Sequence, residues 1–142
     1  MKSARVLLVD DEVDFTDNTK TLLEHRGYDV TAVNSGDSAI RTLGQEKYDV
    51  MVLDLKMPGM DGISTLKEIK KLNFYTQILV LTGHGAINTA LEAMELGAYD
   101  YLTKPCDIDE LTEKLEDAMK NGGSDNKKPS LFGALTKGIR KK

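Results

Sequence analysis

The chain has 142 residues, of which 40% are apolar and 30% charged, a balance that fits one globular domain with its own hydrophobic core. No run of about 18 apolar residues occurs, and the apolar run near the N-terminus is short and ends in acidic residues, so we expect neither a transmembrane helix nor a signal peptide. Residues 1–120 carry 13 basic and 22 acidic side chains, a net charge of −9, whereas residues 121–142 carry 6 basic side chains and Asp125, a net charge of +5. The acidic body disfavours nucleic-acid binding by the domain itself.

The first half of the chain alternates between short apolar runs and amphipathic segments. Strands are predicted at 5–10 (RVLLVD) and 29–33 (DVTAV), because both runs are rich in apolar and β-branched residues. Helices are predicted at 14–26 and at 36–45, where apolar residues recur at helical spacing. Ser35 is the expected N-cap of the second helix.

The second half repeats this alternation three more times. Strands are predicted at 50–54 (VMVLD), 77–82 (QILVLT) and 99–103 (YDYLT), and helices at 62–72, 86–96 and 107–120. Gly97 is expected to end the fourth helix, and Asp107 is expected to cap the fifth. Five strands in strict alternation with five helices predict an α/β fold, a parallel sheet covered by helices on both faces.

Parallel sheets of this kind place functional groups just beyond the carboxyl ends of their strands. In this chain those positions hold acidic, hydroxyl and ammonium groups: Asp10, Asp11, Glu12, Asp54, Thr82, Thr103 and Lys104. Asp54 is the most unusual of them, because an ionised carboxylate at the end of a buried strand needs a metal, a cation or several hydrogen bonds.

The cluster favours magnesium and phosphate chemistry. Carboxylate oxygens, completed by waters and a backbone carbonyl, suit Mg²⁺. A phosphoryl group at Asp54 would meet the metal on one side and Lys104 on the other, and Thr82 could donate a hydrogen bond to it. Such an arrangement is typical of phosphoryl transfer, and aspartate is a competent phosphoryl acceptor.

Four stretches resemble the receiver domain of two-component response regulators: LLVDDE (7–12), VLDLKMPGMDG (52–62), LTGHG (81–85) and GAYDYLTKP (97–105). The resemblance covers about residues 4–120, and it is specific because the order and spacing of the stretches agree. It implies a flavodoxin-like, doubly wound fold with strand order 2-1-3-4-5. The last two stretches are also similar to receivers that precede enhancer-binding transcription activators.

The resemblance also implies roles for the cluster. Asp54 would be the phosphoacceptor, supplied by a sensor histidine kinase, a phosphotransfer protein or a small phosphodonor. Asp11 and Asp54 would bind Mg²⁺ through their side chains and Lys56 through its backbone carbonyl, while Asp10 would assist through water.

A second set of residues would bind the phosphoryl group and respond to it. The resemblance implies that Lys104 pairs with the phosphoryl group, that the bond to Pro105 is cis, that Thr82 moves toward the phosphate and that Tyr101 turns inward behind it. This shift would remodel the surface of the fourth helix, fifth strand and fifth helix, where protein partners bind. Lys56 and His84 would tune the phosphate lifetime.

Simpler interpretations compete for several of these residues. Glu12 is expected to be the solvated start of a helix, and taken alone His84 is a loop residue and Tyr101 a core aromatic. A phosphatase of the haloacid-dehalogenase kind would need a second aspartate where this chain has Lys56. A flavodoxin-like binding module would need a phosphate-cradling loop after the first strand, where the sequence is the acidic DDEVDF.

Residues 121–142 are predicted to be a flexible basic linker and tail, following a receiver domain at 1–120. The linker composition of NGGSDNKKPS (121–130) precedes LFGALTKGIRKK, whose apolar residues fit a short amphipathic helix. Three interpretations stay open: a solubilising end, docking on a partner or on the acidic body, and weak contact with anionic membrane lipids.

For the whole chain we expect a stand-alone signalling switch and not an enzyme with catalytic turnover. It would act by contact with a downstream protein, as a monomer or a phosphorylation-dependent dimer. The alternative is a receiver fragment of a larger transcriptional regulator. The only cysteine, Cys106, leaves no internal disulfide and favours a cytoplasmic location.

Overall fold

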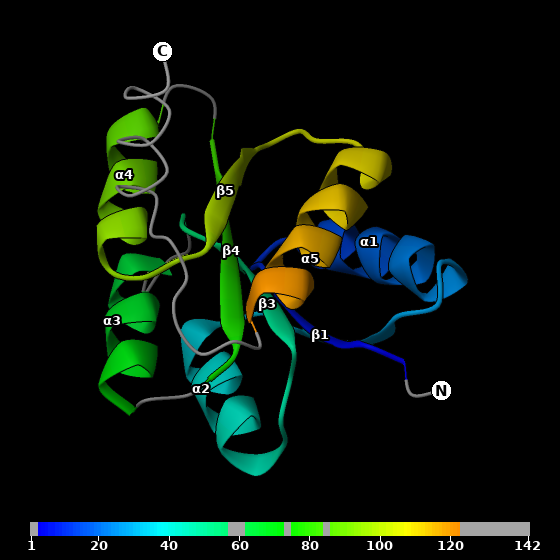
Figure 1. Cartoon of the computed structure of the whole chain (residues 1–142), viewed down its shortest axis with the longest axis horizontal. Helices are drawn as coiled ribbons and strands as arrows, with labels where there is room; N and C mark the ends of the chain where they lie inside the picture. Colours follow the sequence, from blue (N-terminus) through cyan, green and yellow to red (C-terminus); the bar gives the residue numbers. More distant parts are fainter. Residues whose placement is uncertain (1–2, 57–61, 73–74, 84–85, 123–142) are drawn as a thin grey trace.

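Five parallel strands form one sheet in the order β2-β1-β3-β4-β5 in the computed structural model, which describes residues 3–56, 62–72, 75–83 and 86–122 (Figure 1). The strands are β1 (Arg5–Val9), β2 (Asp29–Val33), β3 (Val50–Asp54), β4 (Gln77–Thr82) and β5 (Asp100–Thr103). The helices are α1 (Val13–His25), α2 (Gly36–Gln45), α3 (Gly62–Leu72), α4 (Ile87–Glu95) and α5 (Ile108–Gly122). The predicted α/β class, element order and strand order are confirmed.

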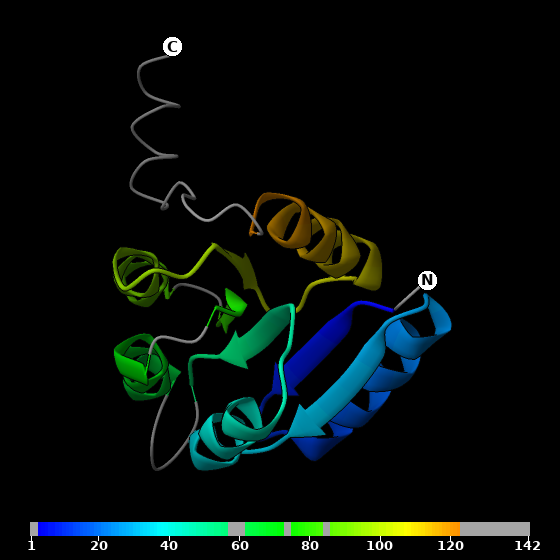
Figure 2. The same ribbon diagram turned by 60° about the horizontal axis from the view of Figure 1, so that its bottom comes forward.

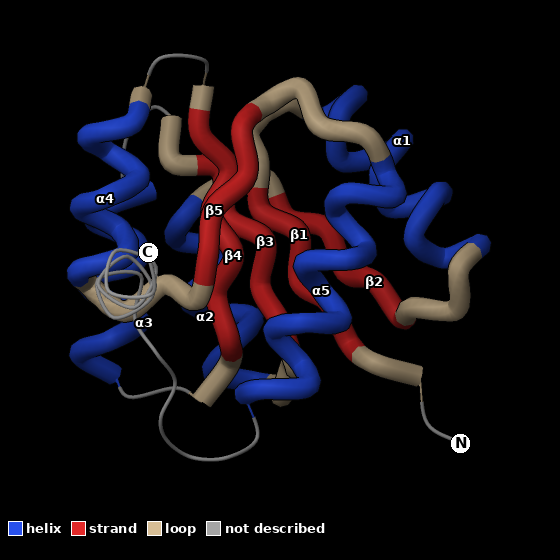
Figure 3. The backbone as a smooth tube through the Cα atoms, turned by 45° about the horizontal axis from the view of Figure 1, so that its top comes forward, coloured by secondary structure: helices blue, strands red, loops and turns tan. Residues whose placement is uncertain are grey.

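The helices lie in two layers, one on each face of the sheet. Figures 2 and 3 show α1 and α5 together over one face and α2, α3 and α4 over the other. Each layer encloses its own apolar cluster, in which Leu23 and Leu115 represent the first layer and Leu66 and Met94 the second. The central strands are buried on both faces, which explains why their sequences are continuous apolar runs without alternation.

The two predicted N-cap residues form the expected hydrogen bonds through their side chains. The Ser35 hydroxyl accepts a hydrogen bond from the Ser38 N–H at 3.1 Å, and the Asp107 carboxylate accepts one from the Glu110 N–H at 2.8 Å. Gly97 follows α4 at φ +109°, a left-handed conformation that glycine adopts readily. Three predicted helices differ from the observed ones by one or two residues at each end, and the first and fifth predicted strands are each one residue too long.

The sheet register aligns the carboxyl ends of neighbouring strands. Val9 pairs with Leu53 across β1 and β3, Asp54 pairs with Leu81 across β3 and β4, and Thr82 pairs with Thr103 across β4 and β5. The residues that follow these positions therefore meet at one edge of the sheet. No helix in the described part of the chain is long and apolar enough to cross a membrane.

Several sequence predictions concern parts outside the described residues. His84 and the tail at 123–142 belong to this group, so the lifetime role of His84 and the three interpretations of the tail stay predictions.

Candidate functional site

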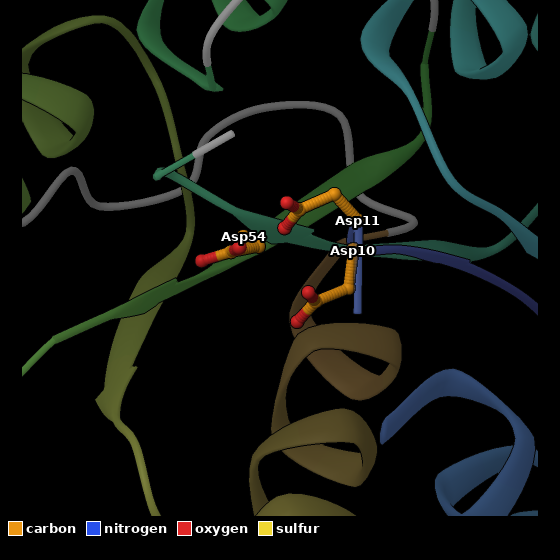
Figure 4. A group of neighbouring side chains, drawn as sticks. All are labelled: Asp10, Asp11 and Asp54. Atoms are coloured by element: carbon orange, nitrogen blue, oxygen red, sulfur yellow. The ribbon is translucent and has the colours of Figure 1, made fainter. Parts of the chain in front are cut away.

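Three carboxylates converge at the carboxyl edge of the sheet. Asp10 and Asp11 come directly after β1, and Asp54 is the last residue of the neighbouring strand β3. One oxygen of each lies within 4.8 Å of an oxygen of the others, and Figure 4 shows the three side chains gathered at this edge. Asp10 and Asp54 are buried whereas Asp11 is exposed, so the cluster opens to solvent on the Asp11 side.

Asp10 is fixed from several directions. Its Oδ1 accepts a hydrogen bond from the Glu12 N–H at 3.0 Å, and its Oδ2 accepts one from the Lys104 ammonium at 2.8 Å. Its backbone carbonyl accepts a further bond from the Asn34 side chain at 2.8 Å. Both carboxylate oxygens of this buried residue are thus engaged within the protein, which suits an indirect role toward a metal ion.

The negative charge of Asp54 is balanced by fewer hydrogen bonds than that of Asp10. The residue is 4% exposed, and the one hydrogen bond that its carboxylate receives from the described residues is a 3.3 Å bond from the Lys56 N–H. Burial, followed by the negative charge of Asp10, raises the pKa of Asp54 from 3.8 to about 6, although Lys104 and the Lys56 N–H act in the opposite direction. A cation that binds next to this carboxylate would therefore stabilise its ionised form.

The residues present fit a magnesium ion. Mg²⁺ prefers carboxylate and carbonyl oxygens and keeps several of its waters. The cluster offers an exposed carboxylate on Asp11 and a weakly compensated one on Asp54, and a divalent ion would offset their mutual repulsion. Lys56 lies two residues after Asp54, and the role of its carbonyl as a metal ligand stays a prediction.

Lys104 approaches from the loop after β5 and pairs with two carboxylates. Its pairing with a phosphoryl group stays a prediction. Its Nζ donates to Asp10 at 2.8 Å and to Glu12 at 2.9 Å, and it lies 4.5 Å from the centre of the Phe15 ring. Partial burial lowers the pKa of Lys104, but the hydrogen bonds to Asp10 and Glu12 outweigh this and raise it overall. Glu12 is an exposed residue at the start of α1, as expected, and its carboxylate also pairs with this ammonium.

The other predicted residues surround the carboxylates at the ends of β4 and β5. Thr82 is buried, and its carbonyl accepts a hydrogen bond from the Lys104 N–H at 2.8 Å, which ties the two strand ends together. The Lys104–Pro105 peptide bond is cis, as expected. Tyr101 is partly buried against the apolar cluster of the α2–α3–α4 layer.

Sequence reasoning missed one glycine that shapes the site. A Cβ built on Gly62 would lie 2.3 Å from the Leu55 Cα and 2.6 Å from the Asp54 carbonyl oxygen, so α3 starts in direct contact with the backbone that carries the phosphoacceptor candidate. The Gly62 N–H donates to the Leu55 carbonyl at 3.2 Å, which holds this approach in place. A glycine at the start of a predicted helix after a buried strand was the available signal.

Comparison with known proteins decides the family. Residues 6–116 match the family model of the response regulator receiver domain. The chain belongs to this family. The receiver domain is 41% identical over 114 residues to the transcriptional regulatory protein ZraR of Escherichia coli (strain K12), covering 80% of this chain and 26% of that protein. The chain therefore spans about a quarter of the length of the curated relatives that it matches.

Solved receiver structures share the fold. A response regulator receiver domain from Clostridium thermocellum superposes with a TM-score of 0.78 at 35% identity, covering 82% of this chain and 94% of that one. Full-length FixJ from B. japonicum gives a TM-score of 0.81 at 34% identity, covering 87% of this chain and 61% of that one. Receiver domains generally bind Mg²⁺ in an acidic pocket and interact with histidine kinases or phosphotransfer proteins, and the three carboxylates provide such a pocket in this chain.

Proposed function

We propose that this receiver domain accepts a phosphoryl group on Asp54 and signals through the change that follows. The observation that carries the proposal is the state of Asp54, a buried and weakly compensated carboxylate beside Asp10 and Asp11 in a chain of this family. The donor would be a phosphohistidine on a sensor kinase or phosphotransfer protein, or a small phosphodonor.

The transfer would need only positioning and charge neutralisation. An Asp54 carboxylate oxygen attacks phosphorus, the new oxygen–phosphorus bond forms, and the bond between phosphorus and the donor's leaving group breaks. Asp11, Asp54 and the Lys56 carbonyl would hold Mg²⁺, with Asp10 assisting through water, and the ion would supply the positive charge that the phosphoryl oxygens require. The Lys104 ammonium and the Thr82 hydroxyl donate hydrogen bonds to those oxygens.

The readout would be the surface of α4, β5 and α5, with Thr82 moving toward the phosphate and Tyr101 turning inward. The way these helices are held supports this proposal. No side-chain hydrogen bond or ion pair joins α4 to any other described residue. By contrast, α5 is tied to its surroundings by ion pairs of Lys114 with Asp100 at 2.5 Å and of Asp109 with Arg26 at 2.8 Å. Apolar packing, without such bonds, holds α4 against the other described residues. A shift of α4 is therefore expected to cost less free energy than a shift of α5.

The domain could act as a switch in either of two kinds of protein. In the first, the domain is a stand-alone, cytoplasmic regulator that contacts a downstream protein as a monomer or phosphorylation-dependent dimer, without catalytic turnover of its own. In the second, it is the receiver part of a larger transcriptional regulator. The second is favoured by one observation, namely that relatives such as ZraR and GlrR of Escherichia coli (strain K12) carry the matched region as 26% and 27% of their length.

A phosphotransfer screen tests the shared core of both contexts. The chain is incubated with phosphorylated candidate sensor kinases and Mg²⁺, and the Asp54→Asn variant serves as the control. Transfer to the wild-type chain and not to the variant supports the proposal. Steady hydrolysis of phosphate esters by the chain would instead support a haloacid-dehalogenase-like phosphatase.

A further inference from the structure

Lys104 is held on the side of the site that faces α1. Its Nζ lies 2.8 Å from Asp10 Oδ2 and 2.9 Å from Glu12 Oε1, with the Phe15 ring below it at 4.5 Å. No hydrogen bond or ion pair joins Lys104 to Asp54 among the described residues. The lysine that is expected to contact a phosphoryl group on Asp54 is therefore hydrogen-bonded to Asp10 and Glu12 in the unphosphorylated domain.

The Glu12 side chain makes no hydrogen bond or ion pair with any described residue other than Lys104. It stands at the N-cap position of α1, yet its side chain makes no capping hydrogen bond. Its side chain is 63% exposed, and Glu12 is not one of the three acidic residues that converge as candidate metal ligands. Its backbone N–H donates a separate 3.0 Å hydrogen bond to Asp10, and a side-chain substitution leaves that bond in place.

We propose that Glu12 is a positioning residue that holds Lys104 away from Asp54, with the Phe15 ring beneath it, and thereby slows phosphorylation. The inference rests on the proposed function of Asp54. When a phosphoryl group arrives, the ammonium must exchange Glu12 and the ring face for phosphoryl oxygens. Asp10 is shared by both arrangements, so the exchange is a short movement of one side chain and not a rearrangement of the loop.

The first test measures how fast the chain is phosphorylated by acetyl phosphate with Mg²⁺, using intact mass. Glu12→Gln, which keeps the shape and removes the charge, is expected to be phosphorylated about two- to fivefold faster than wild type, the factor that corresponds to a typical exposed ion pair. Glu12→Ala, which also removes the acceptor, is expected to be accelerated at least as much. A rate equal to or below that of wild type in both variants overturns the proposal.

Asp14→Asn is the matched control, because Asp14 is an exposed acid in the first turn of α1 with no ion pair to Lys104. It removes one negative charge close to the site, so it reports any general effect of charge on an anionic phosphodonor. An unchanged rate in Asp14→Asn, beside acceleration in Glu12→Gln, supports the proposal. Equal acceleration in the two variants overturns it.

A crystal structure of the metal-free Glu12→Ala variant, which has no side-chain acceptor at residue 12, gives a readout that does not depend on phosphorylation. We expect Lys104 Nζ to keep its contact with Asp10, to leave residue 12 and the Phe15 ring, and to lie nearer Asp54. An unmoved Nζ overturns the proposal even if the rate has changed. Absence of any phosphorylation of the wild-type chain would refute the proposed function itself, whereas equal rates in phosphorylated chains refute only the role of Glu12.

Discussion

Replacing Asp54 with asparagine is expected to stabilise the metal-free domain at neutral pH. The folded state raises the pKa of this carboxyl from 3.8 to about 6, first through burial and then through the charge of Asp10. A folded state with the higher pKa holds the proton more tightly than the unfolded chain does. The stabilisation from protonated Asp54 is therefore complete below pH 3.8 and is lost as the pH rises through about 6.

The size of the effect follows from the shift. A rise of about two pKa units corresponds to about 3 kcal/mol of unfavourable free energy above pH 7. Asparagine removes the charge and keeps the shape, but its amide must find new acceptors in a buried place. We therefore expect a gain of about 1–3 kcal/mol in the free energy of unfolding at pH 7.5, and about half of that gain at pH 5.

Urea denaturation in the presence of a chelator measures this gain at the two pH values. Asp17→Asn, which removes an exposed carboxylate on α1, is the control and is expected to change stability by less than about 0.5 kcal/mol. Two results would refute the reasoning: an Asp54→Asn domain no more stable than wild type at pH 7.5, or a gain of the same size at pH 5.

Three further predictions concern the metal, the backbone and the phosphate lifetime. Saturating Mg²⁺ should stabilise the wild-type domain by about 2–3 kcal/mol at a hundredfold excess over its dissociation constant, and Asp11→Asn should lose most of this gain in the same denaturation assay. Gly62→Ala should destabilise the domain by about 2–4 kcal/mol, because the new methyl group would collide with the backbone of Leu55; a thermal midpoint equal to wild type would contradict the close approach. Substitution of Lys56 or of His84 should alter the rate of dephosphorylation without abolishing phosphorylation, and unchanged decay in both variants would count against the lifetime role.

The fold could be predicted because its strands and helices have different apolar spacing. Runs such as 50–54 are apolar throughout, since both faces of a central strand are covered, and the helical segments repeat at three and four. Ser35 and Asp107 could be recognised as caps because capping depends on residues close in the sequence. The ends of α1 and α4 were each placed one residue too far, since the last turn depends on local geometry that composition does not record.

The carboxylate cluster could be predicted because the topology of a parallel sheet determines where strand ends meet. Asp10, Asp11 and Asp54 needed only the correct element order to be placed together. The partner of Lys104 could not be predicted in the same way. Glu12 and Lys104 are 92 positions apart in the sequence. Both Asp54 and Glu12 lie at the same edge of the sheet as Lys104, so side-chain geometry decides which carboxylate the lysine binds. The approach of Gly62 to Leu55 likewise depends on a backbone distance that no spacing encodes.

The central claim is that Asp54 becomes an acyl phosphate in a magnesium-dependent reaction. Incubation of the chain with acetyl phosphate, with and without Mg²⁺, followed by intact mass and peptide mapping after borohydride reduction, tests it most directly. We predict the mass increase of one phosphoryl group on Asp54, only when Mg²⁺ is present and not in Asp54→Asn. An unmodified Asp54, or modification at another residue, would contradict the account.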